Sequence, residues 1–376
     1  MLWVGAALLA LVVLVFTGAG WYLAGQIDSG ALQVRLGVGQ DVTLRLHGHT
    51  AAVMSSDPDA LGILRASEAM GVQWPGGYVQ LTGPPVRRLR NGAVRHASLL
   101  SGTPPRTSVH GVLDRSAFPA DPRVALGPRV AEVRYPIQRG TAPAWFVPGA
   151  GSTWALLVHG KGTTRVETLR LMRDTIAARL PSLDISYRND PGLPADPSGH
   201  FQYGKTEWRD LASAVDYARA HGARHVDLVG VSMGGSIIAS YLRHRPGAPV
   251  SALVLDAPLL SLADTVSHGA AQLSIPILGH VPGALTWTAE QIAAARYGAD
   301  WSATDYIDDP SWVRVPTLLI HGDRDEKNPL ADSQRLAHAR PGLVRLITFH
   351  GAEHVASWNH YPAEYDAAVR TFLDHQ

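Results

Sequence analysis

The segment His225–Ala239 reads HVDLVGVSMGGSIIA, and this stretch decides the fold. It begins with the apolar run HVDLV, typical of a buried strand, and ends with SIIA, the start of a helical run. Between them lies a glycine-rich turn, Gly230–Gly235, that contains Ser232. Glycines on both sides of a residue let the neighbouring chain pass without a Cβ clash, so the turn can hold Ser232 in strained geometry. The pattern predicts a reactive serine between strand and helix; a merely structural turn is the alternative.

A serine at such a turn becomes a nucleophile only when a base takes its proton. The segment FHGAEH (Phe349–His354) is a predicted strand followed by a glycine-containing loop that ends in His354. We therefore expect His354 to be the base. The flanking His350 falls within the predicted strand, and His360 does not follow the Gly-Ala turn.

The base in turn needs an acid that fixes its tautomer, and three carboxylates compete for this role. The segment LLIHGDRD (Leu318–Asp325) is a strand that runs into a turn, which presents Asp323 and Asp325 at the edge of the sheet. Asp256 follows another apolar run and would reach the histidine from a neighbouring strand. Triad spacing favours Asp325, while the residues alone leave the other two open.

From Arg129 onward, apolar strands alternate with amphipathic helices. The strands are expected after a hairpin over 130–137 and 144–147, at 155–158, 183–186, 226–229, 252–255, 317–320 and 344–348. The helices are expected at about 165–180, 208–221, 233–244 and 362–373. Such alternation predicts parallel crossovers and an α/β fold with a doubly wound, mostly parallel sheet. Sites in these sheets form at the carboxyl ends of the strands.

Residues 129–376 resemble the α/β-hydrolase fold superfamily, specifically its serine hydrolases of the esterase, lipase and peptidase type. Four motifs carry the resemblance in chain order: His159-Gly160 after a strand, Gly230–Gly234, His321–Asp325 with Pro329, and Gly351–His354. The resemblance implies that the acid is Asp325, three residues after the glycine. Tyr187–Asp190 also resembles the Tyr-Arg-Gly segment of membrane-anchored relatives, with Asn189 where glycine is usual.

The resemblance implies acyl transfer through a covalent acyl-enzyme. Ser232 attacks an acyl carbonyl, His354 takes and returns the proton, and Asp325 orients the imidazole. Backbone N–H groups beside the serine are expected to stabilise the oxyanion, namely those of Met233 and of Lys161 or Gly162. His159 and His321 are expected to support loops by hydrogen bonds. No cofactor or metal is needed for this chemistry.

The substrate is predicted to be a small-molecule or lipid acyl ester or thioester. Residues 257–312 form a long insertion between two strands, at a position where members of this family often carry a cap over the pocket. Apolar side chains in this insertion suggest an acyl site: Ile277, Leu278, Leu285 and Trp287. A serine peptidase, an acyltransferase and a non-catalytic scaffold for protein contacts are the alternatives.

Residues 1–26 are predicted to be a transmembrane anchor. Leu2–Gly25 contains 24 residues without a charge, an amide or a histidine, and a helix of that length spans ~36 Å against a hydrocarbon layer of ~30 Å. Aromatic residues typical of interfacial belts lie near both ends: Trp3, Trp21 and Tyr22. A cleaved signal peptide is the alternative, but its apolar core is only ~7–15 residues long. We expect a single-pass membrane protein. Arg35 and Arg45 weakly favour a cytoplasmic location for the part of the chain that follows the anchor.

Residues 27–128 are predicted to form a small β-rich accessory region. Alternating apolar residues indicate strands at Leu32–Leu36 and Val42–Leu46. A capping residue and a proline before residues 60–70 indicate a helix. Asn91-Gly92 between two apolar runs predicts a hairpin turn. No motif in this region indicates its function.

The composition excludes several classes of protein. The 33 basic and 32 acidic side chains leave a net charge of +1 with no block of like charge, so nucleic acid is not an expected partner. The absence of cysteine excludes disulfides, iron–sulfur clusters and thiol nucleophiles. His47 and His49 would share one face of a strand, but no third ligand accompanies them, so no metal site is predicted.

Overall fold

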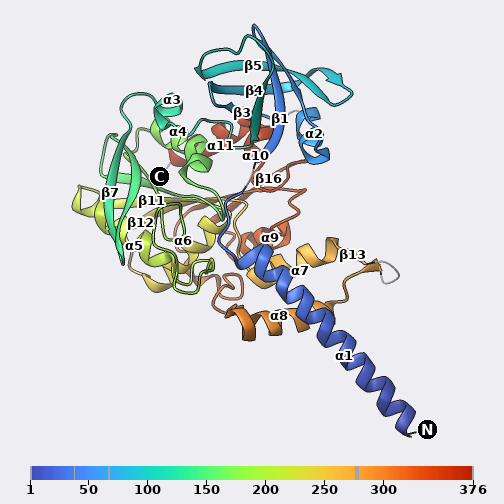
Figure 1. Ribbon diagram of the computed structural model, residues 1–376. Coiled ribbons are helices and arrows are strands. Elements are labelled where there is room, and N and C mark those ends of the chain that lie inside the picture. Colours follow the sequence, from blue (N-terminus) through green and yellow to red (C-terminus); the bar gives the residue numbers. More distant parts are fainter. Residues whose placement is uncertain (1, 38, 67, 276–278, 375–376) are drawn as a thin grey trace.

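The computed structural model describes residues 2–37, 39–66, 68–275 and 279–374. A closed barrel lies beside an eight-stranded sheet with helices on both faces, and a long N-terminal helix projects away from both (Figure 1). The predicted α/β class with a mostly parallel sheet is confirmed.

The eight-stranded sheet has the order β16-β15-β12-β11-β9-β10-β8-β7. Its strands are β7 (Ala131–Ile137), β8 (Gly140–Val147), β9 (Thr153–Val158), β10 (Ser182–Ile185), β11 (His225–Val231), β12 (Val250–Asp256), β15 (Thr317–Gly322) and β16 (Val344–Phe349). The pairs β7–β8 and β8–β10 are antiparallel, and the other neighbours are parallel. The carboxyl ends of β11, β15 and β16 therefore meet at one edge of the sheet.

Helices cover both faces because alternate residues of the central strands point to opposite sides. In β9, Leu156 packs into one hydrophobic core and Leu157 into the other. The first core includes α5 (Trp208–Ala220), α6 (Met233–His244) and α9 (Leu330–Ala339). The second includes α4 (Leu169–Ala177) and α11 (Pro362–Leu373). Three shorter elements also contribute to it: a 3₁₀ turn at Arg165–Thr168, α3 (Pro122–Leu126) and α10 (Ser357–His360).

The barrel lies between the N-terminal helix and the sheet in the chain. It consists of β1 (Gln40–His47), β2 (Thr50–Met54), β3 (Met70–Trp74), β4 (Gly77–Leu89), β5 (Gly92–Gly102) and β6 (Val109–Asp114), with α2 (Pro58–Arg65) beside them. Every neighbouring pair in the order β1-β2-β5-β4-β3-β6 is antiparallel, and β6 pairs again with β1. Closure leaves no free sheet edge, so the barrel has its own apolar core.

Several local predictions in this region are wrong. The predicted strand over Leu32–Leu36 is absent, because Asp28–Leu32 is a π-helical turn that continues the N-terminal helix. The helix predicted to reach Met70 ends at Arg65, and Met70 begins β3. The hairpin turn lies one residue earlier than predicted, since Gly92 pairs with Leu89.

The two histidines considered as metal ligands do not share a strand face. His47 is the last residue of β1, and His49 lies in the tight turn before β2. The prediction that both imidazoles project from one strand is therefore wrong.

The N-terminal helix α1 (Leu2–Ile27) packs by its C-terminal half on α8 (Gly283–Tyr297). The Arg296 guanidinium lies 4.0 Å from the centre of the Trp21 ring, which was predicted to be part of an interfacial belt. Among the described residues, no helix is at once long and apolar enough to cross a membrane. The predicted transmembrane anchor is therefore not supported.

The insertion over 257–312 contains α7 (Leu262–Gln272), the short strands β13 (Ser274–Ile275) and β14 (Gly279–His280), α8 and a 3₁₀ turn at Pro310–Trp312. Of the residues predicted to form an acyl site here, Leu285 is buried and Trp287 is exposed. Ile277 and Leu278 lie outside the described residues.

A buried carboxylate in the sheet makes stability depend on pH. Asp184 in β10 is fully buried, and burial raises the pKa of its side chain to about 7, although Thr168 donates a hydrogen bond to it. Because the folded pKa lies above the ordinary value, this group's contribution to stability falls as the pH rises from about 4 through 7. We expect Asp184→Asn to unfold at a higher temperature than the wild type at pH 8, with a much smaller difference at pH 5. Thermal unfolding at both pH values checks this, and an equal difference at both would contradict it.

Candidate active site

Ser232 stands between β11 and α6 in a backbone conformation that few residues adopt. Its φ is +51° and its ψ is −115°, a strained combination that costs on the order of 1–3 kcal/mol and persists only where the surroundings impose it. A Cβ at Gly230 would lie 2.6 Å from the Cδ1 of Ile238, and one at Gly234 would collide with the carbonyl oxygen of Val158. The turn needs its glycines because α6 passes so close to the sheet.

This packing predicts the effect of a single methyl group. We expect Gly234→Ala to lower the unfolding temperature by several degrees, because the new Cβ displaces the backbone of β9. Gly247→Ala is the matched control, since nothing lies within 4 Å of its Cβ position. Thermal unfolding of both variants tests this, and equal stability would contradict the account.

The side chains of Ser232, His354 and Asp325 form one continuous chain of contacts. The Oγ of Ser232 lies 3.0 Å from the Nε2 of His354, and the Nδ1 of His354 lies 2.7 Å from the Oδ2 of Asp325. They come from the turn after β11, the loop after β16 and the loop after β15. The structure thus brings together the three residues that the sequence analysis selected for the nucleophile, base and acid.

Asp325 is held as a carboxylate by four donors. Its Oδ1 accepts the backbone N–H groups of Lys327 and Asn328, both at 2.8 Å, and its Oδ2 lies 3.2 Å from the Nε2 of His321. Burial alone would raise the pKa of Asp325, but the bonds from His321 and His354 hold it well below its usual range. The group is therefore ionised at any pH at which His354 can act as a base.

The two competing carboxylates have other partners. Asp323 accepts the backbone N–H of Gly351 and contacts the Nδ1 of His350, each at 2.6 Å. Asp256 is fully buried, where Arg170 at 3.1 Å and Tyr365 at 2.8 Å bond to its Oδ2. Neither of these contacts involves His354.

The loop after β9 passes directly beside the serine. A Cβ at Gly160 would lie 3.1 Å from the Cβ of Ser232. The N–H of Gly160 donates to the Oε2 of Glu167 at 2.7 Å, so it is already engaged. The following residues, Lys161 and Gly162, line the same cleft as Ser232, with Met233 at the start of α6.

Residues 30–37 form hydrogen bonds to the loop after β9. The Nζ of Lys161 donates to the carbonyl oxygens of Gly30 and Ala31 at 2.6 and 3.1 Å, and Gly37 donates to the carbonyl of Gly162 at 2.7 Å. Burial and the charge of Lys327 lower the pKa of Lys161 to about 8. The sequence analysis missed these contacts, because no motif connects residues 30–37 with the loop.

His159 and His321 support loops, as expected. The ring of His159 lies 2.9 Å from both the carbonyl of Gly160 and the carboxylate of Asp190. His321 contacts Ser333 and also the acid Asp325. That second contact was not expected, and no spacing rule indicates it.

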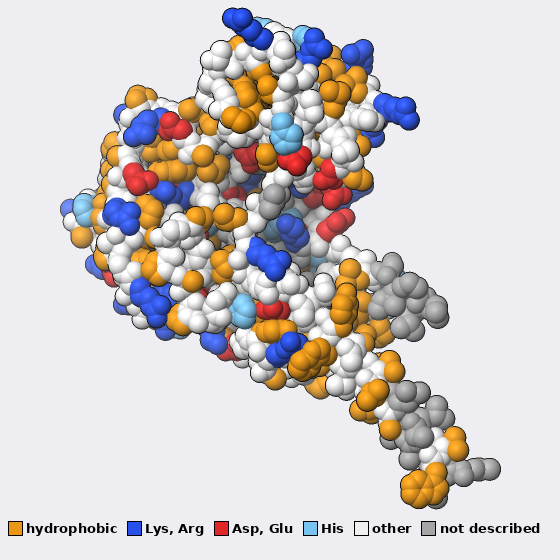
Figure 2. Space-filling view, in the orientation of Figure 1, with side chains coloured by type: hydrophobic (Ala, Val, Ile, Leu, Met, Phe, Trp, Pro, Cys, Tyr) orange, Lys and Arg blue, Asp and Glu red, His pale blue; other side chains and the backbone are white. Residues whose placement is uncertain are grey.

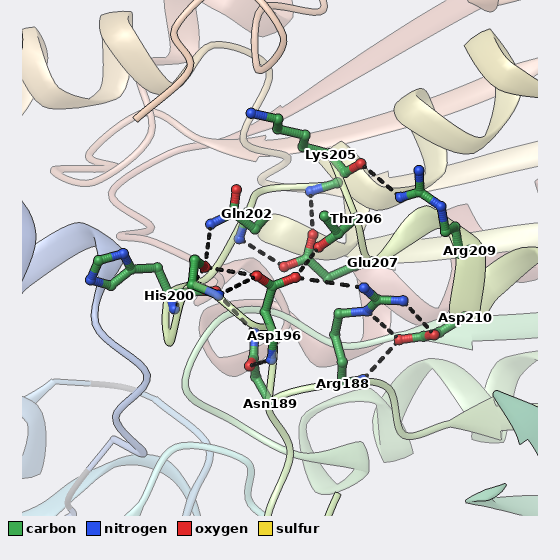
Figure 3. Close-up of polar contacts among 12 residues, drawn as sticks. Arg188, Asn189, Asp196, His200, Gln202, Lys205, Thr206, Glu207, Arg209 and Asp210 are labelled. Atoms are coloured by element: carbon green, nitrogen blue, oxygen red, sulfur yellow. Dashed lines mark hydrogen bonds and ion pairs between the residues drawn. The ribbon is translucent and has the colours of Figure 1, made fainter. Parts of the chain in front are cut away.

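The segment Tyr187–Asp190 is buried and supports the site through polar contacts. Arg188 binds Asp210 through its Nε at 2.8 Å and its Nη2 at 2.9 Å, within the polar network around Asp196 (Figure 3). Asn189 has a φ of +74°, the left-handed region that glycine and asparagine tolerate best. This conformation explains why asparagine can stand where the resembled segment has glycine.

Ser232 opens into a cleft of about 1390 Å³ between the sheet, the barrel and α1. Figure 2 shows the hollow below the barrel. One side is mostly apolar and comes from α1, from α7 with the residue that follows it, and from α8, with the residues Leu23, Ile27, Val266, Ala270, Leu273 and Ala289. The barrel side is mostly polar, with Asp59, Asp114, Arg115 and Ser116. The predicted acyl-site residues Leu285 and Trp287 do not line it.

The comparisons with known proteins agree with this architecture. A family model described as serine aminopeptidase, S33, matches residues 192–314. Among solved structures, an esterase of Pyrococcus furiosus is similar at 16% identity, over 65% of this chain and 92% of the esterase, with a TM-score of 0.50. The chain has the α/β-hydrolase fold.

Other solved structures are similar at the same low identity. Carboxylesterase CesB of Bacillus subtilis is 15% identical over 68% of this chain and 95% of that one, with a TM-score of 0.46. No curated protein matches the chain in sequence. At such identities, likeness to a solved structure concerns the α/β-hydrolase fold and not the substrate.

Proposed function

We propose that this α/β-hydrolase is a serine hydrolase that cleaves acyl ester or thioester bonds through Ser232, His354 and Asp325. The observation that carries the proposal is the unbroken contact from Oγ to imidazole to carboxylate, at 3.0 and 2.7 Å. A serine in strained backbone geometry, with a base in hydrogen-bond reach and an ionised acid behind it, is the arrangement that activates a hydroxyl.

The proposed reaction has two halves. The Oγ of Ser232 attacks the acyl carbon while the Nε2 of His354 takes its proton, and His354 then gives that proton to the departing alcohol or thiol. Water, deprotonated by the same nitrogen, attacks the acyl carbon, the bond from that carbon to the Oγ of Ser232 breaks, and His354 returns the proton to Oγ as the carboxylic acid leaves. In this proposal the N–H groups of Met233 and of Lys161 or Gly162 face the oxyanion, where each such donor typically contributes ~10²-fold or more in rate.

The cleft supports a lipophilic acyl group in this reaction. Its apolar side, formed by α1, α7 and α8, offers an acyl chain a surface away from water. We expect Ala270→Trp, which fills this side, to lower turnover of a dodecanoyl ester about 10-fold while acetyl ester turnover changes less than about 2-fold. Ala271→Trp is the matched control, because Ala271 lies next to it on α7 but outside the cleft lining. Equal chain-length profiles for the two variants would contradict this placement of the acyl chain.

The decisive experiment combines a fluorophosphonate probe with a panel of p-nitrophenyl esters of rising chain length. We expect stoichiometric labelling and measurable hydrolysis. The family model carries the description of a serine aminopeptidase, so aminoacyl p-nitroanilides belong in the same panel, and faster cleavage of these amides would favour a peptidase. A folded chain that neither labels nor hydrolyses any of them would contradict the proposal and favour a non-catalytic scaffold.

We also propose that the chain lies at a membrane surface. The N-terminal half of α1 supports this, because it exposes large apolar side chains such as Trp3, Val13 and Leu14. Sedimentation of the full chain with membranes, compared with a chain that begins at Gln26, tests the proposal. Equal recovery of both chains in the membrane-free fraction would contradict it.

A further inference from the structure

The barrel contacts the loop that carries His354. This loop follows β16, contains α10 and leads into α11, and Figure 1 shows the barrel beside it. Asn359 of α10 is buried, and its Nδ2 donates to the backbone carbonyls of Ala69 at 2.6 Å and Arg115 at 2.8 Å. The N–H of Ala69 donates back to the carbonyl of Asn359 at 2.6 Å. Three hydrogen bonds thus join residues that lie more than 200 positions apart in the chain.

An ionic cluster continues this contact up to the residue next to His354. The Nη2 of Arg115 lies 3.1 Å from the Oε2 of Glu353 and 3.5 Å from the Oε2 of Glu68. His360 lies 3.6 Å from Glu68 and 3.8 Å from Glu353. The ligand atoms of Glu68, Glu353 and His360 lie within 4.8 Å of one another, a spacing that suits a cation, but Arg115 already supplies the positive charge there.

The histidine loop is strained at the position that follows His354. Val355 has a φ of +59°, which is a genuine outlier for a β-branched residue. Such a conformation persists only when contacts on both sides impose it. Glu353, immediately before His354, contacts the barrel through Arg115, and Asn359, five residues after it, contacts the barrel through Ala69.

The barrel is well built to act as a fixed support. Its closed sheet has no free edge, and its core contains a fully buried arginine, Arg95. That guanidinium donates to the carbonyl oxygens of Leu64 and Glu68. The connection from α2 to β3, which carries Glu68 and Ala69, is thereby fastened to the barrel wall.

We propose that the barrel positions the catalytic histidine. Asn359 and the Glu68–Arg115–Glu353 cluster are the residues through which the barrel restrains the loop that carries His354. This inference rests on the proposed function, since it assigns these residues an effect on the base of that reaction. Asn359 does not line the cleft, so it acts through His354 and not on the substrate. The β-rich region then has a definite role in catalysis without contributing a reacting group.

A double-mutant cycle between Asn359 and His354 tests the proposal. We expect Asn359→Ala to slow fluorophosphonate labelling and to lower kcat by about 10- to 100-fold with KM changed less than about 2-fold, because a small displacement of the base is that costly. In a His354→Ala chain, the residual hydrolysis should fall no further when Asn359→Ala is added. A loss that merely reflects a weaker fold would appear equally in both backgrounds and would overturn the proposal.

Two further variants keep the test decisive if Asn359→Ala folds poorly. Glu353→Gln removes the charge that Arg115 binds at a half-exposed position, and we expect a 3- to 10-fold loss of kcat that also vanishes in the His354→Ala background. Asn91→Ala, in the exposed β4–β5 turn of the same barrel, should leave the labelling rate unchanged. Full activity of both Asn359→Ala and Glu353→Gln would overturn the proposal, whereas a wild-type chain that does not label would contradict the proposed function itself.

Discussion

Ser232→Ala is expected to abolish fluorophosphonate labelling and to lower kcat/KM for p-nitrophenyl esters by at least ~10⁴-fold. The Oγ of Ser232 is the atom that lies 3.0 Å from the Nε2 of His354, and its removal leaves no group to form the acyl-enzyme. The residual rate would come from substrate binding and from the oxyanion donors alone. Probe labelling read by intact mass, together with ester hydrolysis, measures both effects.

The control for this variant is a serine on the same helix. Ser236 is buried in α6, where its hydroxyl donates to the carbonyl of Leu259 at 2.6 Å. Ser236→Ala therefore removes a hydroxyl four residues away whose hydrogen bond does not involve the side chain of Ser232, and it should retain labelling. Labelling of the Ser232→Ala chain at the wild-type rate would show that another residue is the nucleophile.

The strand-to-helix turn and the contact of Ser232, His354 and Asp325 were predictable from the sequence because they depend on short-range patterns. Gly230 and Gly234 flank Ser232 at the end of an apolar run, and His354 ends a glycine-containing loop after another. Parallel strands bring their carboxyl ends to one edge, so residues that follow β11, β15 and β16 had to meet. The choice of Asp325 over Asp323 came from triad spacing and from the family resemblance, since both residues follow the same strand.

The cleft and its supports were not predictable, because they join segments that no spacing rule connects. Glu167 bonds to Gly160, Lys161 reaches the carbonyls of Gly30 and Ala31, and Asn359 reaches Ala69. The last two contacts depend on where α1 and the barrel pack on the sheet domain. A barrel closed by β6 on β1 also requires pairings between distant strands, which alternation within one strand does not specify.

Asp325→Asn is the second large effect, and we expect a loss in kcat of about 10³- to 10⁴-fold with KM little changed. The Oδ2 of Asp325 faces the Nδ1 of His354 at 2.7 Å. An amide in its place carries no charge to stabilise the imidazolium. Its N–H group is also a hydrogen-bond donor, placed where the N–H of the ring needs an acceptor. The loss therefore lies in the chemical step, which kcat on short-chain esters measures.

The matched control and the pH dependence of stability make this result specific. Asp323→Asn changes a neighbour whose carboxylate contacts His350 and Gly351, so kcat should remain within about 3-fold of the wild type. Because the folded pKa of Asp325 is depressed, its ionised form contributes stability above pH ~4 that is lost as the pH falls. Asp325→Asn should thus unfold at a lower temperature than the wild type at pH 7, with a difference that starts to narrow only below pH ~4. Assays well below both unfolding temperatures separate catalysis from stability, and loss of turnover in Asp323→Asn or Asp256→Asn with Asp325→Asn unaffected would move the acid to that residue.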